Sequence, residues 1–103
     1  MLLGAMKVYL DDARATPEGW ERALTASHAI TFLQGGEVTE ISLDHDLGPP
    51  EAGTGYTVAC WIEERAAAGE IRRLAWSIHS ANPVGRAKME AAMRSAERYW
   101  GAP

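Results

Sequence analysis

The sequence contains only one cysteine, Cys60, among its 103 residues. One thiol cannot form an internal disulfide, and it offers none of the paired cysteine spacings that are typical of structural zinc sites. The sequence also lacks long apolar runs. The opening MLLGAM is too short for the hydrophobic region of a signal peptide, and no segment reaches the length that spans a bilayer. We therefore predict a cytoplasmic location.

Positive charge is scarce in this chain. Its 10 Lys and Arg residues are outnumbered by 14 Asp and Glu residues, which gives a formal net charge of −4. This balance argues against a broad electrostatic contact with a nucleic acid backbone. One metal ion or two placed arginines can still reverse the field locally. We therefore expect the partner to be a small phosphorylated ligand, a nucleotide or an RNA end, without membrane binding.

Length and composition are those of one small globular domain. A chain of 103 residues can form one modest core but not two. The hydrophobic share of 47% and the charged share of 23% are ordinary for a globular protein. We predict that residues 6–103 form a single domain and that residues 1–5 are a loose N-terminal extension.

The order of secondary structure predicts an α/β fold. Strands are expected over residues 7–10, 20–24, 38–43 and 71–78. Helices are expected between Thr25 and Gly35, over residues 56–68, and from Pro83 onward. Thr25 and Asn82 are the expected N-caps of the first and last of these helices. Segments 13–19 and 48–55 contain proline and glycine and are expected to be loops. Strands that alternate with helices favour a parallel sheet with right-handed crossovers.

Polar residues end three of the predicted strands. They are Asp11-Asp12, Asp44-His45-Asp46 and His79-Ser80. In parallel sheets, ligands bind at the carboxyl ends of the strands. We therefore expect these residues to meet at one edge of the sheet and to form a site there.

The aspartates have two interpretations. Each one alone could simply hydrogen-bond a turn after its strand. Four carboxylates at one edge would repel each other, however, and a divalent cation or a raised pKa would relieve that repulsion. Oxygen ligands favour magnesium, manganese or calcium over zinc. We predict that Asp11, Asp12 and Asp44 bind Mg²⁺ or Mn²⁺.

The histidines and arginines near the strand ends suggest chemistry on a phosphate. A histidine such as His79 can be a packed side chain, but His45 and His79 at neighbouring strand ends are suited to proton transfer. Arg86 lies in the first turn of the last predicted helix, where backbone N–H groups can also hold an anion. The residues predicted to bind the substrate are Ser80, Asn82, Arg86 and Arg14.

Four segments together resemble the cyclic-phosphate processing receiver family, which is related to response-regulator receiver domains. They are YLDDARATPEGW, ISLDHDLG, TGYTVACWIEE and IHSANPVGRAKME, and the resemblance runs from about Met6 to Met93. It implies a small receiver-like (flavodoxin-like) three-layer fold with a mostly parallel sheet of about four strands, truncated relative to ordinary receivers. By this resemblance, Asp11-Asp12 match the acidic pair that binds magnesium in receivers. Asp44 matches the aspartate that accepts the phosphoryl group, with Asp46 as second choice. Ser80 matches the hydroxyl residue that binds the phosphoryl oxygen, and Gly55 matches the glycine of the loop after the aspartate.

Departures from ordinary receivers bear on the function. The lysine after a fifth strand is absent, the loop 13–19 stands in place of the first receiver helix, and two histidines are added. The resemblance implies metal-assisted hydrolysis of cyclic phosphates on nucleotides or RNA ends. The catalytic residues would be Asp44, His45, Asp46 and His79, and a covalent route through Asp44 with Asp46 as proton donor stays open. The alternatives are a receiver-like phosphate-binding or protein-interaction module without catalysis, and a phospho-accepting signalling receiver.

Overall fold

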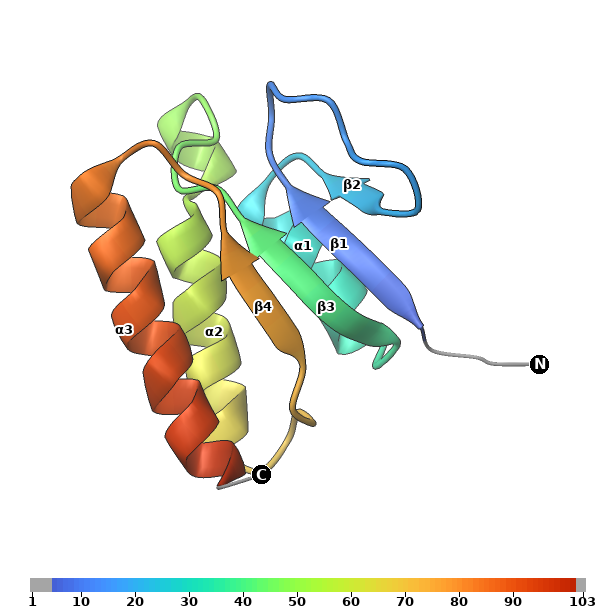
Figure 1. The fold of residues 1–103 in the computed structure, drawn as a ribbon, viewed down its shortest axis with the longest axis vertical. Helices are drawn as coiled ribbons and strands as arrows, with labels where there is room; N and C mark the ends of the chain where they lie inside the picture. Colours follow the sequence, from blue (N-terminus) through green and yellow to red (C-terminus); the bar gives the residue numbers. More distant parts are fainter. Residues whose placement is uncertain (1–4, 102–103) are drawn as a thin grey trace.

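The computed structural model describes residues 5–101, which form a four-stranded sheet and its covering helices (Figure 1). Neighbouring strands are all parallel, in the order β2-β1-β3-β4. The elements are β1 (Met6–Leu10), β2 (Glu21–Ala23), α1 (Ala26–Gln34), β3 (Val38–Leu43), the 3-10 turn η1 (Pro50–Ala52), α2 (Gly55–Ala67), β4 (Ala75–Ile78) and α3 (Pro83–Trp100). The predicted α/β fold with a parallel sheet of four strands is confirmed.

The helices cover one face of the sheet. Alternate side chains of β1 differ in burial: Val8 and Leu10 are fully buried, whereas Lys7 is exposed and Tyr9 is partly exposed. Lys7 and Tyr9 therefore point to the open face of the sheet, opposite Val8 and Leu10, and Figure 1 shows α1 behind the sheet. No helix within residues 5–101 covers this open face. The resemblance implied three layers, but the described chain has two, because a loop stands where the first receiver helix would lie.

The core lies between the sheet and the helix pair α2 and α3. Val58, Ile62, Met89 and Met93 of these helices are fully buried. Gly55, the first residue of α2, makes this packing possible, because a Cβ atom there would lie 2.1 Å from the carbonyl oxygen of Asp44. The start of α2 therefore sits directly against the end of β3.

Side-chain caps fix where the helices begin. The Thr25 hydroxyl accepts a hydrogen bond from the His28 N–H at 3.1 Å, and Asn82 Oδ1 accepts one from the Gly85 N–H at 3.0 Å. Pro83 follows Asn82 at the first helical position, where a missing N–H costs nothing. Both predicted N-caps are confirmed. The second cap places the start of α3 beside the end of β4.

Two predicted boundaries differ in the structure. The strand expected over residues 71–78 begins only at Ala75, which is the first residue of β4 to pair with β3. Ile71 packs instead against the core, and its carbonyl accepts a hydrogen bond from Trp100 Nε1 at 3.0 Å. The predicted loop 48–55 contains the single turn η1, and α2 begins within it at Gly55.

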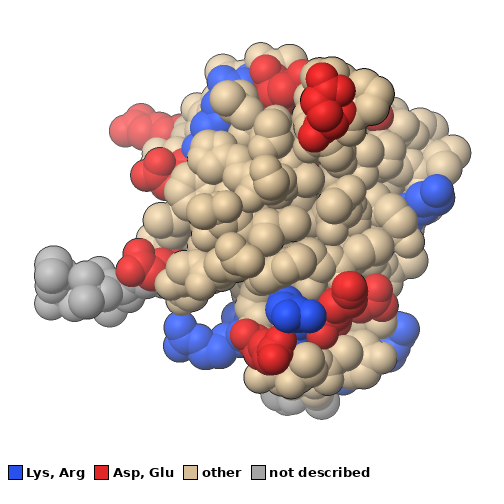
Figure 2. Space-filling view, turned by 180° about the vertical axis from the view of Figure 1, so that it is seen from behind, with Lys and Arg blue, Asp and Glu red and all other residues tan. Residues whose placement is uncertain are grey.

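The surface behind the sheet is seen in Figure 2, where charged side chains gather around the margin of a largely uncharged centre. None of the helices in residues 5–101 combines the length and the apolar character needed to cross a bilayer. The buried hydrophobic residues of the same range form one cluster. The extension expected over residues 1–5 lies outside the described residues except for residue 5.

Replacing Gly55 with alanine tests the close contact between α2 and β3. The added methyl group would overlap the Asp44 carbonyl and, at 2.6 Å, Met89 Sδ, so the backbone must shift. We expect a loss of about 1–3 kcal/mol in the free energy of unfolding, the usual cost of overpacking a core. Urea denaturation measures it. Gly35→Ala is the matched control, because Gly35 has a helical φ of −69°; an equal loss in both variants would contradict the interpretation.

Candidate active site

The site begins with Asp11, which follows β1 and is 1% exposed. Its Oδ1 accepts hydrogen bonds from the N–H groups of Ala13 at 2.7 Å and Arg14 at 2.9 Å. These bonds form a turn around the carboxylate, as aspartates after strands commonly do. The turn leaves Oδ2 directed toward the end of β4.

His79 joins Asp11 to the middle of the sheet. Its Nε2 lies 3.0 Å from Asp11 Oδ2, and its Nδ1 lies 2.7 Å from Ser42 Oγ. The Ser77 hydroxyl donates to Ser42 Oγ at 3.1 Å, so we assign the Ser42 proton to the bond with Nδ1. The His79 proton then lies on Nε2 and faces Asp11. Both ring nitrogens are therefore engaged.

The ring of His79 is also held from the side. It stacks on Tyr9 of β1, with ring centroids 4.3 Å apart and planes 6° from parallel. Its side chain is only 16% exposed. A ring that is hydrogen-bonded at both nitrogens and stacked on a neighbour is suited to holding Asp11 in place, more than to carrying protons to a ligand.

Asp44 follows β3 and lies across from Asp11. Burial raises the pKa of the Asp44 carboxyl above its ordinary value of 3.8, and the negative charge of Asp11 raises it further. The nearby His79 imidazole and hydrogen bonds from the His45 N–H and the Ser80 hydroxyl lower it, but they do not offset the rise. Two carboxylates thus lie close enough to oppose each other's ionisation.

The pKa of the Asp11 carboxyl is shifted in the opposite direction. Burial alone would raise the pKa of its carboxyl. Hydrogen bonds from the N–H groups of Arg14 and Ala13, together with His79, outweigh burial and hold the pKa below 3.8. Asp11 is therefore the anion of the pair and Asp44 the more easily protonated partner.

Asp11, Asp44 and His79 together can hold a metal ion. One ligand atom of each lies within 4.8 Å of the others. Asp12 is not part of this group: its side chain is exposed and turns toward Gly48, where an added Cβ atom would lie 3.1 Å from Asp12 Oδ2. The structure therefore brings together two of the three predicted metal ligands and adds His79.

His45 and Asp46 form a separate pair. His45 Nδ1 lies 2.9 Å from Asp46 Oδ1, and Asn82 Nδ2 approaches both carboxylate oxygens of Asp46 at 3.4 and 3.5 Å. The hydrogen bond with His45 lowers the pKa of the Asp46 carboxyl, so Asp46 stays ionised and accepts a hydrogen bond from the Nδ1–H group. Nε2 of His45 then carries the lone pair, which is the arrangement of a general base oriented by a carboxylate.

Gly85 makes room for His45. A Cβ atom at Gly85 would lie 2.4 Å from Cγ of the His45 ring, so the ring packs directly on the backbone of the first turn of α3. The His45 side chain is 20% exposed. The imidazole is therefore placed at the start of α3, whose N–H groups favour anions.

The predicted phosphate-binding residues hold the loop between β4 and α3. Arg86 Nη1 donates to the carbonyls of Ile78 and Ser80 at 3.1 and 3.3 Å, and Arg14 Nη1 donates to the carbonyl of His79. Ser80 is 5% exposed, and its Oγ accepts a hydrogen bond from the Asn82 N–H at 3.1 Å. These side chains surround the same edge of the sheet as the aspartates.

The predicted convergence of four carboxylates is only half realised, because Asp12 and Asp46 turn away from the Asp11–Asp44 pair. Sequence reasoning also missed Ser42 and Tyr9, which support His79 from below and from the side. A serine in an otherwise buried strand was the available signal. Tyr9 gave none, because it looks like an ordinary strand residue.

The family model for the cyclic-phosphate processing receiver domain matches residues 6–95. The chain belongs to this family. No curated protein and no solved structure matches the chain. Every residue of the cyclic-phosphate processing receiver domain discussed above, from Tyr9 to Arg86, lies within the matched range, so the site is part of the family domain.

Replacing Asp11 with alanine tests the turn and its bond to His79. It leaves two backbone N–H groups and His79 without their acceptor, and we expect a loss of about 1–3 kcal/mol in unfolding free energy at pH 7. Because the folded pKa is lowered, this contribution is complete above pH 3.8 and falls as the pH drops through the folded pKa. Denaturant titrations at pH 7 and pH 3 measure both effects. Asp12→Ala should change stability little, and an equal loss there would contradict the assignment.

Proposed function

We propose that this domain hydrolyses cyclic phosphates on nucleotides or at RNA ends, at the carboxyl edge of its sheet. The observation that carries the proposal is the pair of His45 and Asp46, set one residue from the carboxylate of Asp44. A carboxylate-oriented imidazole is suited to activating water, and the family description names cyclic phosphates. Arg14, Arg86 and the first turn of α3 lie at the same edge and have N–H groups that are suited to binding anions.

The reaction requires one proton to be moved. A water molecule attacks phosphorus and gives its proton to His45 Nε2, while the bond from phosphorus to one ring oxygen breaks. The protonated His45 then returns a proton to the leaving oxygen, which gives a phosphomonoester and a free hydroxyl group. Asp46 keeps the imidazole in the required tautomer throughout, because its carboxylate accepts a hydrogen bond from the Nδ1–H group of His45.

The phosphate would be bound by the residues that hold the loop between β4 and α3. Arg14 and Arg86 each use one nitrogen for backbone carbonyls of this loop, and a guanidinium has further N–H donors for phosphate oxygens. The first turn of α3 offers backbone N–H groups beside them. We propose that Ser80 contributes its hydroxyl when a ligand replaces its bond to Asp44.

Asp11, Asp44 and His79 would hold a divalent cation. The crowding of Asp11 and Asp44 fits this, since a cation between two carboxylates relieves their repulsion. Two oxygens and one imidazole nitrogen favour Mn²⁺ over Mg²⁺. When bound, the cation would neutralise charge on the phosphate oxygens. His79 can bind the cation through Nε2 only when the ring proton lies on Nδ1 instead. Ser42 Oγ can then accept a hydrogen bond from the Nδ1–H group.

The two histidines therefore receive different roles from those predicted. His45 carries the proton, whereas His79 positions Asp11 and serves as the third ligand. The phospho-accepting alternative gains nothing from the fold, because the described residues form no fifth strand and so have no lysine at the end of one. The binding-module alternative is decided by the turnover experiment.

The turnover experiment uses the native protein with Mn²⁺ or Mg²⁺ and either 2′,3′-cyclic nucleotides or RNA that ends in a cyclic phosphate. We expect a phosphomonoester product, and His45→Ala should lower kcat on the order of a hundredfold or more, the usual contribution of a positioned proton carrier. His28→Ala is the control, because His28 lies exposed on α1 and stacks on Phe32. Binding without turnover by the native protein would establish the module alternative, and full activity in His45→Ala would refute the role of His45.

Asp44→Asn tests the metal site through stability. Without metal, the raised folded pKa of Asp44 costs stability at pH 7 and costs nothing below pH 3.8, so the variant should melt higher than the native protein at neutral pH. With Mn²⁺ at about a hundredfold excess over its Kd, the native protein should gain about 2.7 kcal/mol, and Asp44→Asn should lose most of that gain. Thermal melts measure both effects. Asp46→Asn should keep the response to Mn²⁺, and an unchanged melting temperature of the native protein in millimolar Mn²⁺ would rule the site out.

A further inference from the structure

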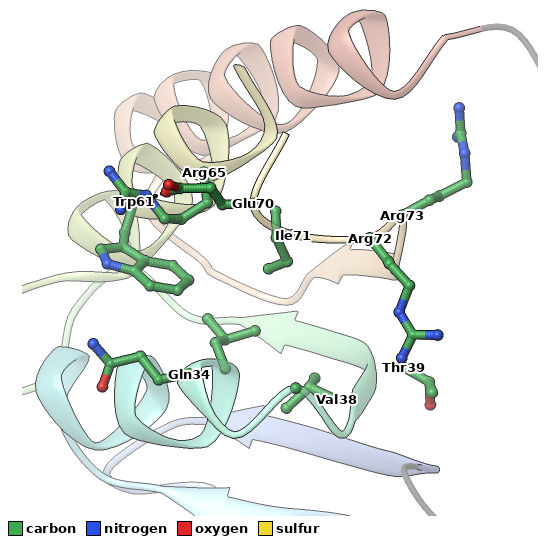
Figure 3. Close-up of a pocket in the computed structure, with 11 residues that line it drawn as sticks. Gln34, Val38, Thr39, Trp61, Arg65, Glu70, Ile71, Arg72 and Arg73 are labelled. Atoms are coloured by element: carbon green, nitrogen blue, oxygen red, sulfur yellow. Dashed lines mark ion pairs between the residues drawn. The ribbon is translucent and has the colours of Figure 1, made fainter. Parts of the chain in front are cut away.

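A second concave site lies at the opposite edge of the sheet, near the amino ends of β3 and β4. It is a cavity of about 670 Å³ between the end of α1, the middle of α2 and the segment 70–73 that precedes β4 (Figure 3). Cavities of this size commonly bind small organic molecules. None of its lining residues belongs to the candidate active site.

The wall of this cavity is mixed, with an apolar strip among polar residues. Val38 and Ile71 lie between its two ends, and the indole of Trp61 forms a flat surface at one end (Figure 3). Leu33 also lines the cavity. Trp61, Val38 and Ile71 are only partly buried by the protein. A ligand with an apolar or aromatic body would bury the surface that they leave exposed.

Arg65 has a hydrogen-bond donor without an acceptor at the Trp61 end. Its guanidinium lies 5.9 Å from the centre of a Trp61 ring, and its Nη1 pairs with Glu70 Oε1 at 2.9 Å. Arg65 Nε, in contrast, is buried and has no hydrogen-bond partner within residues 5–101. An unsatisfied buried donor is unfavourable. A ligand acceptor in the cavity would satisfy it once the Arg65 side chain shifts enough to expose Nε.

Arg72 supplies positive charge at the other end. Figure 3 shows its guanidinium beside Thr39, and it forms no ion pair with any residue of the described chain. The adjacent Arg73 turns away from the cavity: it donates to the Gly101 carbonyl and lies over Trp100. Glu70 is already paired with Arg65, so the cavity has an excess of positive charge in a chain whose net charge is −4.

We propose that this cavity binds a small organic anion with a planar aromatic body. Its acidic group would lie against Arg72, its ring against Trp61 and the apolar strip, and an acceptor atom would meet Arg65 Nε. The shared chemistry fits an aromatic carboxylate and a nucleoside phosphate alike. The site is separate from the one proposed for hydrolysis, because it occupies the amino rather than the carboxyl edge of the sheet.

The test uses the full chain and the fluorescent anion 8-anilinonaphthalene-1-sulfonate. We expect saturable binding and chemical-shift changes confined to backbone amides around the cavity, such as those of Gly36, Thr39 and Ile71. N-phenyl-1-naphthylamine has the same rings without the sulfonate and should bind at least tenfold more weakly. Equal binding of the neutral probe, or shift changes outside the cavity, would overturn the proposal.

Arg72→Glu should weaken binding of the anionic probe at least tenfold. Arg98→Glu is the matched control, because Arg98 is exposed on α3, lies outside the cavity, and undergoes the same change of charge. Equal losses in both variants would show that the effect comes from the change in net charge, and would refute the site. Competition with AMP and with 1-naphthoate distinguishes a nucleotide from an aromatic carboxylate as the preferred class, and displacement by either supports the site.

Asp44→Asn separates this proposal from the proposed hydrolysis. It alters the other edge of the sheet and should leave the affinity for the anionic probe unchanged. Arg72→Glu should in turn leave turnover of cyclic phosphates unchanged. Loss of probe binding in Asp44→Asn would show that the probe occupies the carboxyl edge, which would overturn the second site without touching the first.

Discussion

The hydrogen bond between Asp11 and His79 is the contact on which the carboxyl edge of this domain depends. Asp11 ends β1 and His79 follows β4, and these two strands are not neighbours, because β3 lies between them. Ser42 of β3 completes the link by bonding His79 from below. Three strand ends are thus fixed relative to one another by one imidazole. Hydrogen bonds from the N–H groups of Arg14 and Ala13, together with His79, keep Asp11 ionised although it is buried, and the charge of Asp11 in turn raises the pKa of Asp44.

The sequence was sufficient to predict the edge of the sheet where the candidate site lies. It did not predict which of the polar side chains at that edge point toward one another and which turn away. Parallel strands bring their carboxyl ends together whatever the loops do, so Asp11, Asp44 and His79 were expected at one place. Beyond the strand ends, side-chain direction depends on turns. The turn around Asp11 sends Asp12 outward, and the contact with Asn82 draws Asp46 toward α3. The turn around Asp11 is local, but residue type allows it at either aspartate, and the contact of Asp46 joins residues that are 36 apart in the sequence. Residue type and spacing do not decide either outcome. The predicted strand over residues 71–78 was too long because its apolar pattern begins at Ile71, before Ala75, the first residue that pairs with β3.

The two site histidines show how neighbouring groups decide what an imidazole can do. His79 is hydrogen-bonded at both nitrogens and stacked on Tyr9, so its position is determined by the sheet. His45 has one nitrogen bound to Asp46 and its ring set against Gly85, which leaves the other nitrogen to face a ligand. Residue type alone suggested a symmetrical acid and base. The surrounding hydrogen bonds instead differ between the two: both nitrogens of His79 are engaged, whereas only Nδ1 of His45 is.

The uncovered face of the sheet has a consequence for how this domain can vary. Because the helices pack on the other face, side chains such as Lys7, Glu40 and Ala75 can change without repacking the core. Tyr9 and Ser42 lie on the same uncovered face and contact His79 directly. The uncovered face therefore reaches the candidate site within one residue. A substitution at one of its exposed positions would change the surroundings of the Asp11–His79 pair without disturbing the core between sheet and helices.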